Sequence, residues 1–455
     1  MLARPLSETS ALLCLLCIFL IPLAIAGIAI VNGGLGRSHS ASHAMLTSIS
    51  VFAVAAGTYF LCGFALQGFI GGPGRDIVVA GRSWNWLGNE PMFLRGINAY
   101  NSPSSLAVLL QLFAVGLVAL IPLGAGLERW RLSASCASTV LLAGWVYPLF
   151  AHWAWDGGWL AQLGVNSGMG HGFLDVGGSG SIHVVGGLTA LAVSWILGPR
   201  TGKYSSEDIP SAIPGHNTVL VLFGCFLAFV GWLGLNSAAA ILFTGAPPQR
   251  IVLIAVNTTL AASAALLTTV IITGMRFGRP DVSISANGWV GGLVAGSAAS
   301  PFIAPAAAVF IGLVAGALVT YSVEWFELRL MVDDPGGAIS VHAVGGIWGL
   351  LALGIFANFR DPVLNVTDAA GGFSAAIAAA GAGQWLAQLV GVATLVGFVL
   401  PLSYALNLIL NRFVPFRVHM EGERQGLDLY ELGGGAYPEF VTHTEDFTQF
   451  RKRKS

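Results

Sequence analysis

Long hydrophobic runs dominate the chain, and almost no charged residue falls inside them. A helix needs about 20 apolar residues to cross a hydrocarbon core of about 30 Å. The runs that reach this length are 11–31, 45–70, 102–127, 132–155, 176–199, 216–249, 251–275, 282–323, 335–359 and 380–411. The run 282–323 is too long for one crossing, and prolines at Pro301 and Pro305 split it near 300–305. The pattern predicts an all-α membrane protein with 11 transmembrane helices.

Composition agrees with a multi-pass membrane protein. Of the 455 residues, 55% are hydrophobic and only 9% are charged, whereas soluble domains carry about 25% charged residues. The mean hydropathy is +0.75. This excludes an ordinary soluble enzyme, because a folded interior cannot hide so much apolar surface and the remainder must face lipid. The net charge of −1 leaves no basic region for phosphate binding, so we expect no nucleic-acid partner.

The distribution of basic residues predicts the orientation in a cell membrane, either inner or plasma. With the C-terminal tail 413–455 in the cytoplasm, most of the 21 Lys and Arg residues fall on cytoplasmic segments. The positive-inside rule therefore favours an outside N-terminus and a cytoplasmic C-terminus. As an alternative, residues 1–26 are a cleaved signal peptide, because Ala24-Ile25-Ala26 offers small residues to a peptidase. Cleavage would leave ten crossings.

A repeat places two histidines at equivalent positions. Residues 175–187 and 334–346 share the pattern D-x-G-G-x-x-S-x-H-x-V-G-G without a gap. The copies lie on the fifth and tenth predicted helices, and an odd displacement inverts the second copy relative to the membrane. We therefore expect a 5+5 inverted repeat, with halves at about 11–199 and 216–359 and helix 11 added outside it, within a membrane domain of residues 1–412. Inverted repeats are typical of transporters and channels.

His183 and His342 are the candidate site residues of this repeat. Each lies about eight residues into its helix, or about 12 Å at helical rise, so both approach mid-membrane from opposite ends. Polar side chains at that depth line a pathway or pair with each other. We predict that ring nitrogens of the two lie about 2.7–3.2 Å apart. A competing hypothesis is an electron carrier with haem between the two rings. Loop histidines such as His43 are expected at the solvated surface.

Several motifs resemble the ammonium transporter (Amt) branch of the Amt/Rh family, from about residue 11 to about residue 440. Besides the histidine motifs, the matches are Gly33-Gly34-Leu35 with Arg37, Glu128-Arg129, His152-Trp153-Ala154-Trp155, Gly231-Trp232, Val332-Asp333-Asp334-Pro335, and Gly426-Leu427-Asp428 to Ala436-Tyr437. The resemblance implies ammonium transport. NH4+ is recruited outside and deprotonated, and NH3 passes through an apolar pore lined by the histidine pair.

The resemblance also implies a recruitment site at the outer mouth. Trp155 matches the tryptophan that shapes the outer cation site, and Asp175 matches the acid at the outer end of helix 5. Phe113 comes one residue before the position of the first gate phenylalanine, Leu235 replaces the second, and Ala239 replaces the serine of the recruitment site. These departures leave the histidines intact but weaken the expected cation site. They favour an alternative function, an ammonium sensor or transceptor with little flux.

The same resemblance implies partners. We expect a homotrimer with one pore in each subunit, and a PII-type regulatory protein at the cytoplasmic face. Ammonium or ammonia is the expected cargo, and membrane lipid surrounds the protein. We expect no enzymatic activity, no cofactor and no metal. The five cysteines fall in apolar runs and are expected to serve packing.

Overall fold

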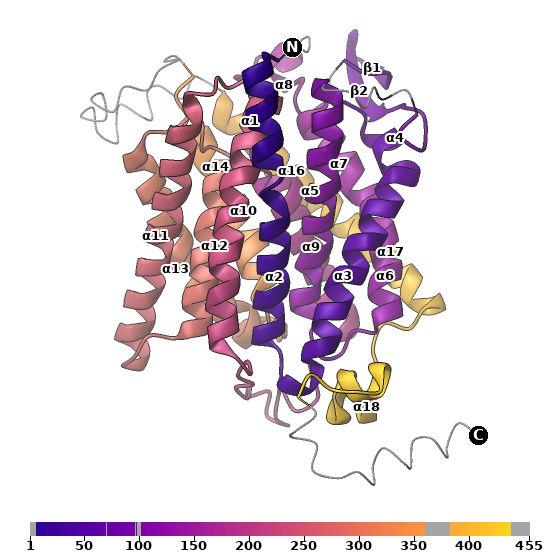
Figure 1. The fold of residues 1–455 in the computed structure, drawn as a ribbon, viewed down its shortest axis with the longest axis vertical. Coiled ribbons are helices and arrows are strands. Elements are labelled where there is room, and N and C mark those ends of the chain that lie inside the picture. The colour runs from indigo at the N-terminus through magenta and orange to yellow at the C-terminus, as the bar shows by residue number, and fades with distance from the viewer. Residues whose placement is uncertain (1–5, 70, 96, 98–101, 360–382, 438–455) are drawn as a thin grey trace.

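One bundle of long helices forms most of the protein (Figure 1). The computed structural model describes residues 6–437 except 70, 96, 98–101 and 360–382. Within this part of the chain, ten helical segments are long and apolar enough to cross a membrane. The predicted start of helix 11 at 380 and the tail beyond 437 lie outside the described residues. The hydrophobic runs thus correctly identified a multi-pass membrane protein.

Five membrane-length segments make up the first half, and their bounds lie within two turns of the predicted ones. They are α1 (Glu8–Ile18) with α2 (Ile21–Leu35); α3 (Ala41–Thr58), η2 (Tyr59–Gly63) and α4 (Phe64–Gln67); α5 (Pro103–Gly126); α6 (Leu132–Leu141), η3 (Leu142–Val146) and α7 (Tyr147–Trp155); and η4 (Ser179–Val184) with α9 (Val185–Leu197). The elements η2 to η4 are π-helical turns.

The second half follows the same plan. Its segments are α10 (Thr218–Thr244), α11 (Arg250–Phe277), α12 (Val282–Ser297), α13 (Pro305–Arg329), and the π-helical η5 (Ile339–Val344) with α14 (Gly345–Phe356). α12 has 16 residues, which is short for a crossing. It packs against α11, α13 and α14 and corresponds to the part of the predicted run 282–323 that precedes the split at 300–305. The last segment is α16 (Gln384–Thr394), η7 (Leu395–Val399) and α17 (Leu400–Phe413).

The two ends of the bundle carry different elements (Figure 1). A hairpin of β1 (Gly74–Val79) and β2 (Arg82–Gly88) lies at the end where α1 begins, which we call the hairpin end. Helix α18 (Met420–Gln425) lies at the opposite end, which we call the tail end. The described chain thus starts and finishes at opposite ends, as an odd number of crossings requires.

The two histidine-bearing segments run antiparallel. Arg200, which follows α9, bonds the carboxylate of Asp333, which precedes η5, at 2.8 Å. At the other end, a Cβ on Gly180 of η4 would lie 3.0 Å from the side chain of Leu350 in α14. Each segment therefore begins where the other ends, and this arrangement supports the predicted inversion of the repeat.

Small residues bring the first helices of the two halves close together. A Cβ on Gly27 of α2 would lie 2.4 Å from the backbone nitrogen of Ala228 in α10, and one on Gly231 would lie 2.1 Å from that of Ala24. No larger side chain fits at these positions without moving the backbone. Close packing of this kind is typical of membrane helices, whose association relies on van der Waals contact.

The tail packs onto the tail end of the bundle. Asp428 begins the short π-helical η8 (Asp428–Leu432), and its carboxylate accepts hydrogen bonds from the backbone N–H groups of Ser42 and His43 at 3.1 and 2.7 Å. The ring of His43 bonds Glu431 at 2.8 Å. The expectation of a solvated His43 is wrong, because docking of the tail leaves this residue only 5% exposed.

Candidate functional site

His183 and His342 lie side by side in the interior. Their Nδ1 atoms are 3.2 Å apart, which confirms the predicted contact, and their ring centroids are 5.2 Å apart with planes inclined by 23°. His183 is 0% and His342 4% exposed. A hydrogen bond between two Nδ1 atoms takes one N–H donor and one bare acceptor, and either ring can supply the proton.

The local backbone of both copies explains why the rings meet. Gly178 and Gly337 occupy equivalent positions in the repeat, and both have left-handed backbone, with φ of 84° and 66°. Glycine is favoured there because it lacks a Cβ. Each glycine lies at the start of a π-helical turn that contains the histidine. Such turns within helices are frequent at functional sites. Sequence periodicity gave no sign of these turns.

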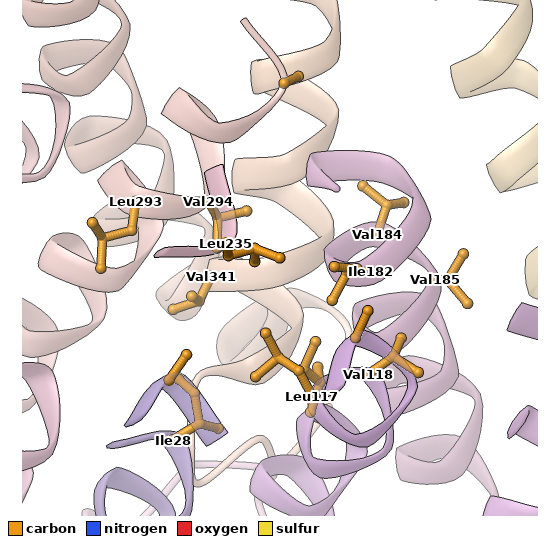
Figure 2. Close-up of a cluster of buried hydrophobic side chains, with 14 of the residues drawn as sticks. Ile28, Leu117, Val118, Ile182, Val184, Val185, Leu235, Leu293, Val294 and Val341 are labelled. Carbon is orange, nitrogen blue, oxygen red and sulfur yellow. The ribbon is translucent and has the colours of Figure 1, made fainter. Parts of the chain in front are cut away.

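Apolar side chains surround the pair. Figure 2 shows Ile182 and Val184, the neighbours of His183, in one buried cluster with Val341 and Leu235. The indole of Trp232 stacks on the ring of His183 at 5.0 Å and 8°. Among the described residues, the Nε2 atom of His183 has no hydrogen-bond partner. An unpaired ring nitrogen in an apolar interior is costly, and such groups mark functional sites.

The geometry does not fit the haem hypothesis. A metal held between two imidazoles needs about 2 Å to each nitrogen, whereas the facing nitrogens are 3.2 Å apart. A porphyrin also requires a pocket of several hundred Å3, and Trp232 already covers one face of His183. Within the described residues there is no cluster of three or more metal-ligating side chains.

A small cavity extends from the pair towards the tail end. Its lining combines His342 with apolar side chains such as Val31 and Val290, and with the amides of Asn32 and Asn287. Gly336 and Ala338, which lie at the start of the second repeat copy, also line it. His342 therefore borders this cavity, although the residue is only 4% exposed.

Trp155 and Asp175 meet at the hairpin end. The indole N–H of Trp155 donates to the backbone oxygen of Asp175. One carboxylate oxygen, Oδ2, accepts bonds from the N–H of Gly180 at 3.0 Å and from the N–H and hydroxyl of Ser181 at 2.7 and 2.8 Å. Burial raises the pKa of the Asp175 carboxyl, and these donors partly offset the rise. Asp175 therefore caps η4, as its position in the sequence suggests.

The other three predicted residues lie on two helices. Leu235 and Ala239 are fully buried on α10, and Phe113 is half-buried on α5. The sequence analysis missed Phe243, one turn beyond Ala239, whose ring stacks on Trp155 at 4.9 Å and 8°. Positions 235, 239 and 243 share one helix face, because residues four apart are neighbours. That spacing was the signal that could have identified Phe243.

A buried ion network lies at the tail end. Arg200 donates to both oxygens of Asp333, at 2.8 and 3.0 Å, and to Glu128 at 2.8 Å. Arg129 donates to the backbone oxygen of Asp333 at 2.7 Å. Burial raises the pKa of Asp333, but Arg129 and Arg200 outweigh burial and bring it down to about 2. The network joins the ends of α5, α9 and α13.

The pKa of the neighbouring Asp334 is shifted in the opposite direction, upwards. Its carboxylate accepts bonds from the N–H groups of Ala338 at 3.0 Å and Ile339 at 2.7 Å, at the start of η5. It thus occupies the place of Asp175 in the second copy of the repeat. Burial raises the pKa of Asp334 to about 6, although the two N–H donors favour the charged form.

Known proteins with similar sequences and structures point to one family. A profile of the Ammonium Transporter Family matches residues 12–437. The chain is 36% identical over 438 residues to ammonium transporter Amt2 of Archaeoglobus fulgidus, covering 95% of this chain and 89% of that one. It is 30% identical to an ammonium transporter of Bacillus subtilis, covering 92% and 96%. Among solved structures, a sensor Amt protein matches with TM-score 0.79 and 27% identity over 93% of this chain and 98% of that one. The chain belongs to the Ammonium Transporter Family.

Proposed function

We propose that the protein carries ammonium across a cell membrane, with the hairpin end outside and the tail end in the cytoplasm. The observation that carries this proposal is the contact between His183 and His342, one from each half of the repeat, at 3.2 Å in an apolar interior. In this proposal, the route of the cargo through the bundle passes this pair. The family of the chain supports ammonium as the cargo.

The physical chemistry of the interior favours passage of NH3. A cation over an aromatic ring gains about 0.5–2 kcal/mol, so Trp155 helps to collect NH4+ at the mouth. Moving the bare cation through apolar surroundings costs far more than this contact returns. NH4+ therefore loses a proton before crossing, and neutral NH3 passes the histidine pair. The proton stays outside or moves along the pair. K+ has no proton to lose and is excluded.

The predicted mouth residues have distinct roles in this proposal. Trp155 offers a ring face to the cation, and Asp175 fixes the start of η4 while its charge stabilises NH4+ from a distance. Leu235 and Ala239 line the route between the mouth and the histidines without contributing an aromatic face or a hydroxyl. Phe113 closes the route from α5. Phe243 backs the indole of Trp155.

We further propose the assembly that the family resemblance implies. Three copies form a homotrimer within the lipid, each with its own pore. The tail end then faces the cytoplasm, where a PII-type regulatory protein would meet the docked tail and the loop after α9. Chemical crosslinking in native membranes tests the trimer, since a ladder that stops at three copies is expected.

Current measurement on proteoliposomes adsorbed to a supported membrane tests transport. Ammonium pulses should give a current or, if flux is neutral, a rise of pH inside the vesicles reported by a trapped dye. The double variant His183→Ala, His342→Ala should abolish both signals or lose selectivity against K+. A matched control is His419→Ala, which replaces a residue at the start of α18 far from the pair. A wild-type protein that is silent in both assays would contradict transport.

A second candidate is an ammonium sensor with little flux. Leu235 and Ala239, which weaken the expected cation site, favour it, as does the similarity to a protein named sensor Amt. Ammonium-dependent thermal stabilisation together with silent transport assays would support the sensor over the transporter.

A further inference from the structure

Two buried glutamines on α16 face the loop that precedes Asp175. Gln384 and Gln388 lie one helical turn apart, and neither is exposed. They belong to the last membrane segment, which lies outside the repeated halves. A buried amide is costly unless both its donor and its acceptor are used. The partners of these two amides are therefore informative.

Both glutamines bond the backbone of residues 171–174. For Gln384, Oε1 accepts from the N–H of His171 at 2.9 Å, and Nε2 donates to the oxygen of Gly172 at 2.8 Å. For Gln388, Oε1 accepts from the N–H of Leu174 at 2.9 Å, and Nε2 donates to the oxygen of the same residue at 2.7 Å. Each amide thus pairs with the loop as a neighbouring strand would. We call these four bonds the glutamine clamp.

Gln388 also reaches the second half of the repeat. Its Nε2 donates a further bond, at 3.2 Å, to the backbone oxygen of Leu350 in α14. The side chain of Leu350 in turn lies against Gly180 of η4. One amide therefore holds Leu174 from the first half and Leu350 from the second half in a fixed relation at the hairpin end.

The loop fits closely against the glutamines. Gly170 has a φ of 54°, and a Cβ there would lie 2.6 Å from Oε1 of Gln384. Gly172 has a φ of 80°, and a Cβ there would lie 2.1 Å from the backbone oxygen of Ala161. Both positions require glycine for conformation and for space. The two glycines therefore let the loop backbone lie close against Gln384 and Ala161.

The clamp lies one residue from the proposed ammonium mouth. Leu174 directly precedes Asp175, whose backbone oxygen receives the indole N–H of Trp155 and whose carboxylate caps η4. A shift of the backbone at Leu174 would therefore move the indole and the start of η4 together. We propose that Gln384 and Gln388 are positioning residues of the mouth. This inference rests on the proposed ammonium transport.

Leucine substitutions test the clamp directly. Gln388→Leu and Gln384→Leu keep the side-chain volume in an apolar setting and remove the amide. Gln162→Leu is the matched control, because Oε1 of Gln162 accepts from the N–H of Asn85 in the hairpin and takes no part in the four bonds of the clamp. All three proteins are compared with wild type in hydrogen exchange of the peptide containing residues 171–175 and in the ammonium dependence of transport.

The expected results separate positioning from general stability. Exchange of residues 171–175 should become about tenfold faster in both clamp variants, because the protecting bonds are lost. The ammonium concentration for half-maximal transport should rise about fivefold or more, with the maximal rate within about twofold of wild type. Gln162→Leu should change neither quantity. A fall in maximal rate alone would indicate a merely structural role and overturn the proposal.

Gln388→Glu provides a pH-dependent rescue. A protonated glutamic acid supplies one donor and one acceptor, which is enough for the two bonds to Leu174 without the longer bond to Leu350, whereas the carboxylate would face both backbone oxygens without a proton. The half-saturating concentration relative to wild type should therefore be near one at about pH 5.5 and raised at about pH 8. A ratio that does not change with pH would overturn the proposal.

The two proposals fail in different ways. Silent transport in wild type would contradict the proposed function, while exchange of residues 171–175 would still report on the clamp. Faster exchange together with unchanged half-saturation, in a wild type that transports, would show that the clamp holds the loop without positioning the mouth. Unchanged exchange in both leucine variants would show that there is no clamp.

Discussion

The ring of Phe243 stacks on the indole of Trp155, with centroids 4.9 Å apart and planes inclined by 8°. One face of the indole is therefore occupied from within the protein. In the proposed recruitment of NH4+, the opposite face is the one that would meet the cation. The indole N–H is fixed separately by the backbone oxygen of Asp175. The orientation of Trp155 thus depends on two contacts, one from α10 and one from the loop before η4.

Phe243→Ala should weaken apparent ammonium affinity by about threefold to tenfold. The variant removes a stacking partner worth about 0.5–1.5 kcal/mol and lets the indole tilt away from the cation. The concentration dependence of transport, or of thermal stabilisation by ammonium, measures the change. Phe229→Ala on the same helix, whose ring contacts Trp289 instead, is the control. Affinity equal to or tighter than wild type would contradict a role for Phe243.

Ala239→Ser should tighten ammonium binding by a few fold. It adds one hydroxyl with little volume, and a hydrogen bond to a charged group contributes about 1.5–3 kcal/mol before the cost of ordering. Leu235→Phe should instead lower the unfolding temperature, because Leu235 is 0% exposed and overpacking costs about 1–3 kcal/mol. Binding isotherms and thermal unfolding of each single variant distinguish the two effects. Equal affinities in wild type and Ala239→Ser would show that the missing hydroxyl is replaced by another group.

Asp175→Asn should leave the fold intact and remove most of the ammonium flux. Asparagine also caps helices, and its side-chain oxygen can accept the bonds that Oδ2 receives from Gly180 and Ser181. The variant therefore removes charge and keeps the cap. Proteoliposome flux and size-exclusion chromatography measure the two properties. Near-normal flux would mean that Asp175 only caps η4.

Asp334→Asn is the comparison for Asp175→Asn. Asp334 occupies the equivalent position at the tail end, so its neutral variant should retain recruitment from outside. If both variants abolish flux equally while folding is kept, the assignment of Asp175 to an external site is wrong.

Asp333→Asn should destabilise the protein by about 3–5 kcal/mol near pH 7, because it leaves Arg129 buried without a nearby carboxylate and Arg200 paired with Glu128 alone. The pKa of Asp333 is about 2 in the folded protein and about 3.9 in an unfolded chain. A depressed pKa gives stability that is full above about pH 4 and disappears as pH falls through about 2. The difference in unfolding free energy between wild type and variant should therefore shrink from pH 5 to pH 2.

The contribution of the adjacent Asp334 to the free energy of unfolding should depend on pH in the opposite direction. Its pKa of about 6 lies above the unfolded value, so its contribution is favourable below about pH 4 and is lost as pH rises through about 6. Asp334→Asn should therefore gain stability relative to wild type between pH 5 and pH 7. Thermal unfolding in detergent across this range measures both variants. If the stability of both variants relative to wild type changed in the same direction with pH, the assigned pKa shifts would be contradicted.

The sequence predicted the crossings and the repeat because both depend on local composition. Hydrophobic runs identify helices that face lipid, and a gapless pattern gave the equivalence of His183 and His342. The break between α1 and α2 and the π-helical turns were not predicted, since they depend on tertiary contacts. The hairpin at 74–88 is too short and too exposed to stand out between two long apolar runs.

Residues that act through the backbone were the hardest to predict. Gln384 and Gln388 look like ordinary polar residues at the start of a helix, and only the folded chain shows that they bond residues 171–174. The buried position of His43 likewise depends on a tail almost 400 positions later in the chain, where Asp428 and Glu431 approach it. Phe243 was predictable in principle from helical spacing. The family pattern places a phenylalanine at 235, however, whereas the aromatic ring that contacts Trp155 lies two turns later, at 243.

The bond between His183 and His342 limits how far the two halves of the protein can slide past each other. Each half contributes one ring, and the nitrogens are already 3.2 Å apart, so rocking by even about 1 Å would part them. A protein that works by alternating access must make such a movement in every cycle. The proposed transport is therefore expected to keep the pair intact and to use a stationary pathway instead of alternating access.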